Sequence, residues 1–173
     1  MSTEILQQSI RDIPDFPKPG IVFKDITPFL RDPVAFGVFI DLLADQYRDA
    51  DLDAIVAIDA RGFLFGGALA RALNIGLVPV RKKGKLPSAC ISEEYELEYG
   101  TAIVEMHDDA LKSGERVLIL DDLLATGGTV AATLKLCRKL GAEPVACAFL
   151  IELSFLNGRE KLGDIPIFAP IVV

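Results

Sequence analysis

The chain has 173 residues, of which 51% are hydrophobic, with a net charge of −7 and a pI of about 4.7. This length predicts one domain with a sizeable core, and the acidic balance argues against a nucleic-acid-coating protein. No run of about 18 apolar residues and no signal-peptide pattern is present, so we expect a cytoplasmic protein without a membrane span. The three cysteines (Cys90, Cys137 and Cys147) lack a metal-ligand spacing and are interpreted as reduced structural thiols.

The apolar periodicity predicts strands that alternate with helices. In chain order the predicted elements are a helix at 4–11, an extended piece at 21–26, a helix at 33–48, a strand at 54–58, a helix at 63–73, strands at 77–80, 99–106 and 117–120, a helix at 128–140, a strand at 144–151 and a terminal extended piece at 165–173. Asp32 and Pro33 favour the start of the second helix. Segment 86–95 has no clear period and predicts a long mobile loop. The alternation predicts a parallel α/β sheet flanked by helices.

The chain is organised around the stretch from Arg116 to Thr129. Its apolar run ends at two carboxylates, Asp121 and Asp122, and a small-residue turn at 125–129 precedes the next helix. Such a turn offers backbone N–H groups, two hydroxyls and a helix N-terminus, which together can hold a phosphate dianion. The carboxylates follow a strand, where open α/β sheets bind ligands, and can accept sugar hydroxyls or hold a hydrated Mg²⁺.

A cationic cluster follows another predicted strand. Arg81, Lys82, Lys83 and Lys85 lie directly after strand 77–80 in an otherwise acidic chain. A local positive cluster near a phosphate site favours further anion binding. The alternative interpretation of the lysines is a solvated loop, and the sequence leaves open which of them contacts a ligand.

Five ordered motifs resemble the adenine phosphoribosyltransferases, which are type I phosphoribosyltransferases. They are DFPKPGIVFKDITP at 15–28, ARGFLFG at 60–66, RKKGKLP at 81–87, EYGTAIVE at 98–105 and DDLLATGGT at 121–129. The resemblance implies a type I fold in a single domain of residues 1–173, with residues 1–32 contributing a small base-binding hood. It also implies a homodimer that uses Mg²⁺ to convert adenine and phosphoribosyl pyrophosphate (PRPP) to AMP and pyrophosphate in purine salvage.

The resemblance assigns a substrate role to matching positions. The 5′-phosphate is expected at the turn of Ala125, Thr126, Gly127, Gly128 and Thr129, and the ribose hydroxyls at Asp121 and Asp122. The pyrophosphate is expected at Arg61, Arg81, Lys82 and Lys85, and Asp59 and Ala60 are also expected to bind substrate. Mg²⁺ is expected to be held mainly by the PRPP phosphates, with Asp121 and Asp122 reaching it through water.

Catalysis and base selection are implied for other positions. Glu98 matches the proposed acceptor of the adenine N9 proton, with Tyr99 as its partner and Arg61 as a third catalytic residue. In the hood, Phe23 offers a ring for stacking, whereas Val22 and Lys24 offer main-chain groups that distinguish the adenine amine from the carbonyl of other purines.

Two alternatives stay open at this point. One is a phosphoribosyltransferase for another purine base. The other is a catalytically silent PRPP-binding regulator, against which the acidic charge and the lack of an added DNA-binding domain argue. For the enzyme, we expect residues 86–98 to be poorly ordered without ligand and to close over PRPP.

Overall fold

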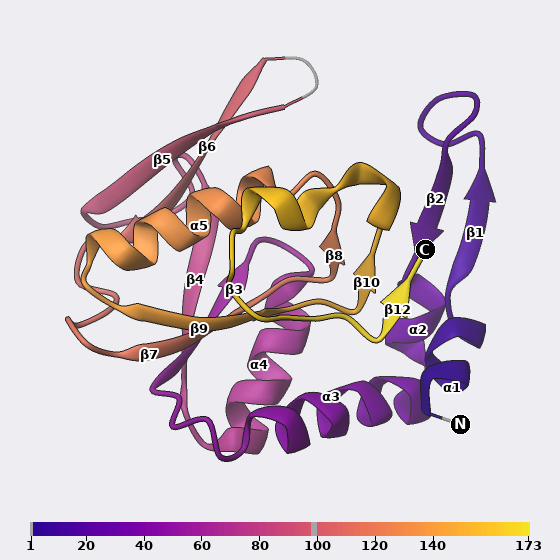
Figure 1. Cartoon of the computed structure of the whole chain (residues 1–173), viewed down its shortest axis with the longest axis horizontal. Coiled ribbons are helices and arrows are strands. Elements are labelled where there is room, and N and C mark those ends of the chain that lie inside the picture. Colours follow the sequence, from indigo (N-terminus) through magenta and orange to yellow (C-terminus); the bar gives the residue numbers. More distant parts are fainter. Residues whose placement is uncertain (1, 98–99) are drawn as a thin grey trace.

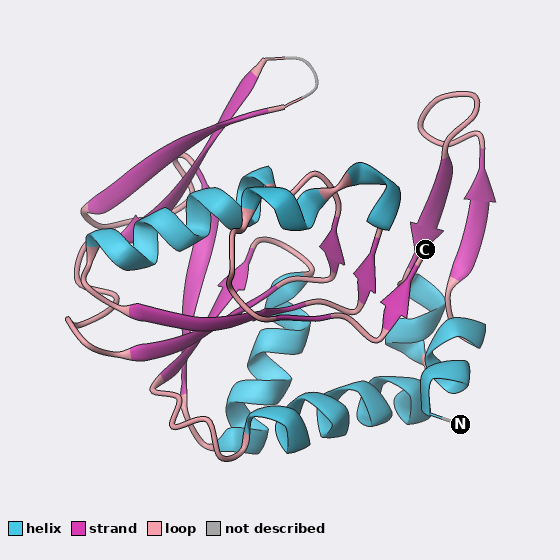
Figure 2. Cartoon of the chain, in the orientation of Figure 1, coloured by secondary structure: helices cyan, strands magenta, loops and turns pink. Residues whose placement is uncertain are grey.

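The computed structural model describes residues 2–97 and 100–173, so the predicted catalytic residues Glu98 and Tyr99 lie outside the described residues. Helices cover both faces of a central sheet, and a separate strand pair projects beside it (Figures 1 and 2). This layered arrangement of helices and a mostly parallel sheet confirms the predicted fold class.

The described residues form a main sheet of seven strands in the order β11–β9–β7–β3–β4–β6–β5. These strands are β3 (Ala54–Ile58), β4 (Gly76–Lys82), β5 (Cys90–Glu96), β6 (Thr101–His107), β7 (Arg116–Leu120), β9 (Glu143–Ala148) and β11 (Ile167–Phe168). The pairs from β11 to β4 are parallel, whereas β6 pairs antiparallel with both β4 and β5. The predicted parallel order therefore holds for the centre of the sheet and changes at the β4 edge.

A smaller parallel sheet extends the carboxyl edge of the main one. It contains β8 (Leu123–Leu124), β10 (Ile151–Glu152) and β12 (Ile171–Val172), in the order β12–β10–β8. Both β8 and β10 follow a main-sheet strand after two residues, β7 and β9 respectively. The small sheet therefore forms a shelf directly beyond the strand ends where the acidic motif lies.

Three long helices enclose the sheet. They are α3 (Pro33–Tyr47), α4 (Gly62–Leu73) and α5 (Gly128–Lys139). Figure 1 shows α3 and α4 on one face and α5 on the other. The Asp32 carboxylate accepts hydrogen bonds from the backbone N–H groups of Val34 and Ala35, so the predicted N-cap of α3 is confirmed.

The core has two halves because the central strands are buried on both faces. Along β3, Ile55 packs in the cluster that includes the apolar side chains of α3 and α4, whereas Val56 packs in the cluster that includes those of α5. Leu118 and Ile119 divide in the same way along β7. A strand with two buried faces needs a continuous apolar run, which is why these strands were predictable from sequence.

The hood begins with α1 (Ser2–Gln8) and ends with α2 (Thr27–Arg31), and between them β1 (Arg11–Pro14) and β2 (Val22–Asp25) form an antiparallel pair. Hydrogen bonds from Thr27, together with that from Arg11, lower the pKa of Asp25 to about 2. Asp25 therefore ties the end of β2 both to β1 and to the start of α2.

The prediction of a long loop at 86–95 was wrong for most of that segment. Residues Cys90–Glu96 form β5, which pairs antiparallel with β6 along its whole length. Ile91 and Tyr95 face the core half beneath α5, Glu93 lies on the same side, and Ser92 and Glu94 are exposed on the other. The segment is therefore one arm of a β-hairpin rather than irregular chain.

The interpretation of the cysteines agrees with the structure. All three thiols are free, and Cys137 and Cys147 are buried. Burial raises the pKa of both buried thiols to about 12, which keeps them protonated. Within residues 2–97 and 100–173, no helix has the length and apolar character needed to cross a bilayer.

Candidate functional site

The predicted site residues come from three neighbouring strand ends. β4, β3 and β7 are parallel neighbours, so their carboxyl ends lie at one edge of the sheet. Asp59 and Arg61 follow β3, Arg81 lies near the end of β4, and Asp121 and Asp122 follow β7. The fold thus brings together the acidic motif and the cationic cluster, which are about 40 residues apart in sequence.

The loop of Ala125–Thr129 (the 125–129 loop) ends at an uncapped helix. Gly127, with φ of 77°, is the N-cap of α5, and it makes no side-chain cap hydrogen bond among the described residues. The first backbone bond into the helix runs from the N–H of Ala131 to the carbonyl of Gly127. The preceding N–H groups of the first turn therefore have no intrahelical acceptor, and the positive end of the helix dipole faces the loop.

A small cavity lies against this helix end. It has a volume of about 80 Å³ and is lined by Asp121, Leu123 and residues 125–130. The loop residues predicted to hold a phosphate therefore surround one space, with a carboxylate at its side. Unpaired N–H groups at a helix N-terminus are a ready-made site for an anion in that space.

The two carboxylates differ in their surroundings. Asp122 is 6% exposed, and its Oδ2 accepts a hydrogen bond from Arg61 Nε at 2.5 Å. Asp121 lines the cavity and accepts the backbone N–H of Asp122 at 2.8 Å. Desolvation and the neighbouring Asp122 carboxylate raise the pKa of Asp121 well above its usual range, against the opposing effect of Arg61. Asp122 thus anchors Arg61, and Asp121 faces the ligand space.

Asp59 anchors the cationic cluster. Its Oδ2 accepts a hydrogen bond from Arg81 Nε at 3.1 Å and lies 3.5 Å from Lys85 Nζ. Arg81 also donates to the carbonyl of Lys85 at 3.2 Å and lies 5.9 Å from the centre of the Phe63 ring. The Asp59 side chain is 7% exposed, so one buried carboxylate organises two cations at the sheet edge.

The remaining predicted residues of this half of the site lie at the surface. Lys82 is exposed and makes no ion pair among the described residues, so its ammonium is available to a ligand. Ala60 is exposed in the turn after β3, and its peptide bond with Asp59 is cis. The loop of residues 81–85 is held from behind by Glu105, a residue that sequence reasoning missed.

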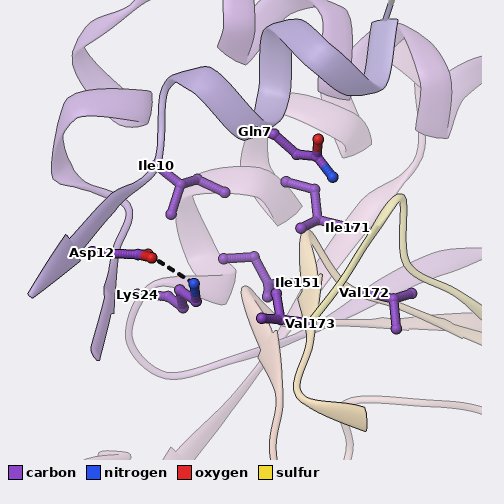
Figure 3. A pocket seen from close by; sticks show the side chains of 8 residues that line it. All are labelled: Gln7, Ile10, Asp12, Lys24, Ile151, Ile171, Val172 and Val173. Carbon is purple, nitrogen blue, oxygen red and sulfur yellow. Dashed lines mark hydrogen bonds and ion pairs between the residues drawn. The ribbon is translucent and has the colours of Figure 1, made fainter. Parts of the chain in front are cut away.

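The hood presents Phe23 and Lys24 on different sides of β2, because neighbouring strand residues alternate in direction. Phe23 lines an apolar cavity of about 260 Å³ with Ile13 and Phe16. The Phe16 ring packs edge-on against the Phe23 ring, with 5.3 Å between the ring centres. Lys24 donates to Asp12 at 2.8 Å, and both line a second cavity beside the C-terminal residues (Figure 3). The Lys24 ammonium is therefore engaged within the hood.

The main chain of β2 is available on one side. In the described residues β2 pairs only with β1, so no strand satisfies the backbone groups along its other edge. Val22 is 51% exposed at the start of this strand. The hood thus offers main-chain donors and acceptors together with an aromatic ring.

The β5–β6 hairpin lies against α5 and the 125–129 loop. Glu93 pairs with Lys135 at 3.0 Å and with Lys139 at 2.7 Å, both on α5. Near the tip, the Tyr95 ring and the carbonyl of Glu96 pack so close to Gly128 that a Cβ added to this glycine would lie 3.1 Å from the ring. The end of β5 therefore packs directly against the start of α5.

The carboxylates of this site suit a metal only as outer partners. Within the described residues, no group of three or more His, Cys, Asp or Glu side chains has the arrangement of a metal centre. Asp122 is engaged by Arg61, which leaves Asp121 as the carboxylate that faces the cavity. This donor set fits a hydrated Mg²⁺ whose main ligands come from a bound phosphate compound.

Fold and site together define an α/β protein whose site, at the carboxyl edge of a parallel sheet, suits a phosphorylated, anionic ligand. A family model described as a phosphoribosyl transferase domain matches residues 31–164. The chain is 56% identical to the adenine phosphoribosyltransferase of Halothermothrix orenii, over 94% of this chain and 96% of that protein.

Solved structures agree with this match. The adenine phosphoribosyltransferase of Thermoanaerobacter pseudethanolicus superposes with a TM-score of 0.95 at 53% identity, covering 99% of each chain. That of Saccharomyces cerevisiae, solved with an imino-altritol bisphosphate and adenine, has a TM-score of 0.92 at 41% identity and covers 98% of each chain. The chain belongs to the phosphoribosyltransferase family, and within it to the adenine phosphoribosyltransferases.

Proposed function

We propose that the protein transfers the phosphoribosyl group of PRPP to adenine, releasing AMP and pyrophosphate in purine salvage. The observation that carries this proposal is the meeting, at one sheet edge, of an uncapped helix N-terminus, two carboxylates and an anchored cationic cluster. These three groups match the phosphate, the sugar and the pyrophosphate of PRPP. Membership in the adenine phosphoribosyltransferases adds the base.

The 125–129 loop, hereafter the phosphate loop, binds the 5′-phosphate. Backbone N–H groups of the loop and the Thr126 and Thr129 hydroxyls donate to its oxygens, and the helix dipole favours its charge. Asp121, at the side of the same cavity, accepts hydrogen bonds from the ribose hydroxyls. Asp122 orients Arg61, because its Oδ2 accepts a hydrogen bond from Arg61 Nε at 2.5 Å.

The segment Arg81–Lys85, which comprises the last two residues of β4 and the turn after them and is hereafter called the pyrophosphate loop, binds the leaving group with Arg61. Asp59 holds Arg81 and Lys85, so these cations are oriented before the substrate arrives. Lys82 is free to contact the pyrophosphate directly. When bound, Mg²⁺ neutralises phosphate oxygens and so favours departure of pyrophosphate; the PRPP phosphates hold it, with Asp121 as a partner through water.

The reaction is a displacement at C1 of the ribose. The bond from C1 to the pyrophosphate oxygen breaks, the bond from adenine N9 to C1 forms, and the N9 proton leaves. Glu98 accepts that proton with Tyr99 as its partner, as the family resemblance implies. The chain's contribution is mainly positioning and stabilisation of the negative charge that develops on pyrophosphate.

Adenine is selected by the hood. The unpaired edge of β2 supplies a main-chain carbonyl that accepts a hydrogen bond from the 6-amino group and an N–H that donates to a ring nitrogen. A purine with a 6-carbonyl group would face that carbonyl with a second acceptor. Phe23 supplies the stacking face. Because Lys24 is engaged by Asp12, its contribution to the base is through its main chain.

A panel of bases tests the function. Purified protein, PRPP and Mg²⁺ are expected to release pyrophosphate with adenine and little with hypoxanthine, guanine or xanthine, and chelation of Mg²⁺ is expected to stop turnover. Equal turnover of guanine would contradict adenine as the specific base and would favour a phosphoribosyltransferase for another purine. PRPP binding without turnover of any base would instead indicate a silent regulator.

The assembly and location follow from the family resemblance. We propose a homodimer located in the cytoplasm. Light scattering on the purified protein measures the first, and fractionation of the source cells measures the second.

A further inference from the structure

The phosphate loop is backed by a distant turn of the chain. Residues Gly158–Lys161 form the short 3₁₀ helix η2. A Cβ atom added to Gly127 would collide with the carbonyl oxygen of Gly158, and one added to Gly158 would collide with the carbonyl of Ala125. The two backbones therefore interlock, with a glycine on each side of the contact.

The turn is itself anchored to the strand beside the phosphate loop. Arg159 donates two hydrogen bonds to Glu152, from Nε at 2.6 Å to one carboxylate oxygen and from Nη2 at 2.5 Å to the other. Glu152 lies on β10 and pairs in register with Leu124, the residue before the phosphate loop. The N–H of Leu153 also donates to the Leu124 carbonyl at 2.9 Å. One bidentate pair thus links the turn behind the loop to the strand in front of it.

The two partners of this ion pair differ in burial. The Glu152 side chain is 7% exposed, whereas that of Arg159 is 49% exposed. Arg159 is the one cation recorded as pairing with Glu152 among the described residues. Loss of Arg159 would leave a buried carboxylate unpaired, and the turn would relax away from the loop before the rest of the fold responds.

We propose that Glu152, Gly158 and Arg159 are positioning residues that hold the phosphate loop in its anion-binding shape. They set the affinity for the ribose 5-phosphate group and leave the affinity for the base unchanged. This inference rests on the proposed function, in which the phosphate loop binds that group. The reason for the selectivity is the set of contacts: among the described residues, η2 meets the phosphate loop at Gly127 and Ala125, and the ion pair of Arg159 with Glu152 involves no hood residue.

Steady-state kinetics of Arg159→Met, Arg159→Lys and Glu152→Gln tests the inference. Arg159→Met is expected to raise the KM for PRPP and the Kd for AMP by about tenfold or more, with the KM for adenine within about twofold of the parent value. Arg159→Lys, which keeps the charge and one donor, is expected to lie between the parent and Arg159→Met. The same split is expected for Glu152→Gln.

Arg116→Met is the matched control. Arg116 also pairs with a carboxylate, Glu143 at 3.1 Å, but at the amino end of β7, away from the phosphate loop. This variant is expected to lose stability without a change in the KM for PRPP. Melting temperatures of all variants separate loss of stability from loss of affinity, and the conservative Arg159→Lys and Glu152→Gln carry the test should Arg159→Met not fold.

Gly127→Ala distinguishes a failure of the positioning role from a failure of the phosphate-loop assignment. If Gly127→Ala raises the KM for PRPP while the Arg159 and Glu152 variants do not, the positioning role is wrong and the phosphate loop stands. If none of these variants affects PRPP, the assignment of the phosphate loop itself fails. An equal rise of both KM values in the Arg159 variants would also overturn the positioning role.

Discussion

The carboxylate of Glu105 on β6 accepts a hydrogen bond from the backbone N–H of Gly84 at 2.9 Å. Its other oxygen accepts from the Ser92 hydroxyl on β5 at 3.1 Å. Glu105 is 8% exposed, and Gly84 lies inside the pyrophosphate loop with φ of 83°. One buried acid therefore connects the pyrophosphate loop to the hairpin that carries Glu98.

Glu105→Ala is expected to loosen the pyrophosphate loop. The Gly84 N–H loses its acceptor, so the KM for PRPP rises by about tenfold and the free energy of unfolding falls by about 1–2 kcal/mol. Glu105→Gln is the control, because its amide oxygen can accept from Gly84 while its NH₂ group donates to the Ser92 oxygen. Enzyme kinetics and urea unfolding measure both; a Gln variant as impaired as the Ala variant would argue for a role of the charge.

Arg61→Met is expected to lower kcat/KM for PRPP by about 100-fold. The change removes a guanidinium from the leaving group and leaves the buried Asp122 carboxylate without its cation. Arg48→Met is the control, since Arg48 pairs with the exposed Asp45 at the C-terminal end of α3. A loss in the Arg48 variant comparable to that in Arg61→Met would contradict a specific role for Arg61.

Asp121→Asn is expected to stabilise the protein at neutral pH while lowering its activity. The raised pKa of Asp121, caused by desolvation and by Asp122, means that the folded state binds more protons than the unfolded state between pH 3.8 and the raised value. Wild-type stability therefore falls as the pH rises through this window, and Asn removes that part of the slope. Its amide oxygen still accepts the N–H of Asp122.

The measurement is urea unfolding of both proteins from pH 4 to pH 8. We expect the advantage of Asp121→Asn to grow with pH, and a reduced kcat/KM because the ribose loses a charged acceptor. Parallel stability curves would show that Asp121 does not ionise in this way.

Glu93→Gln is expected to release the β5–β6 hairpin from α5. Lys139 and Lys135 lower the pKa of Glu93 by hydrogen bonding, so the carboxylate is ionised and paired at neutral pH. Hydrogen exchange should speed up at residues 90–97 and 100–107, with less than about 1 kcal/mol lost globally because the lysines are half-exposed. High salt should reproduce the effect in the parent protein, and unchanged exchange in both cases would contradict it.

The central strands and the turn that leads into α5 were predictable because their signals are local. β3 and β7 are short apolar runs with two buried faces, and each ends at a carboxylate. The DDLLATGGT string places its carboxylates, turn and helix start within nine consecutive residues. Residues that lie close in sequence keep their relation in any fold that forms the strand and the helix.

β5 was missed because its pattern depends on distant residues. Glu93 occupies an inward position between Ile91 and Tyr95, so the strand does not show apolar alternation. The charge is acceptable there because Lys135 and Lys139 arrive from α5, more than 40 residues later. The same reason hides Glu152 and Gly158, whose contacts with Arg159 and with the phosphate loop exist only after the chain has folded.

The separate two-stranded hood has a consequence for how such proteins diversify. In the function that we propose, the sheet edge acts on the ribose, whereas the purine contacts the β1–β2 pair, a ribbon of fewer than 20 residues, through main-chain groups. A new base preference can therefore arise by remodelling that ribbon alone, while the machinery that activates the sugar is inherited intact.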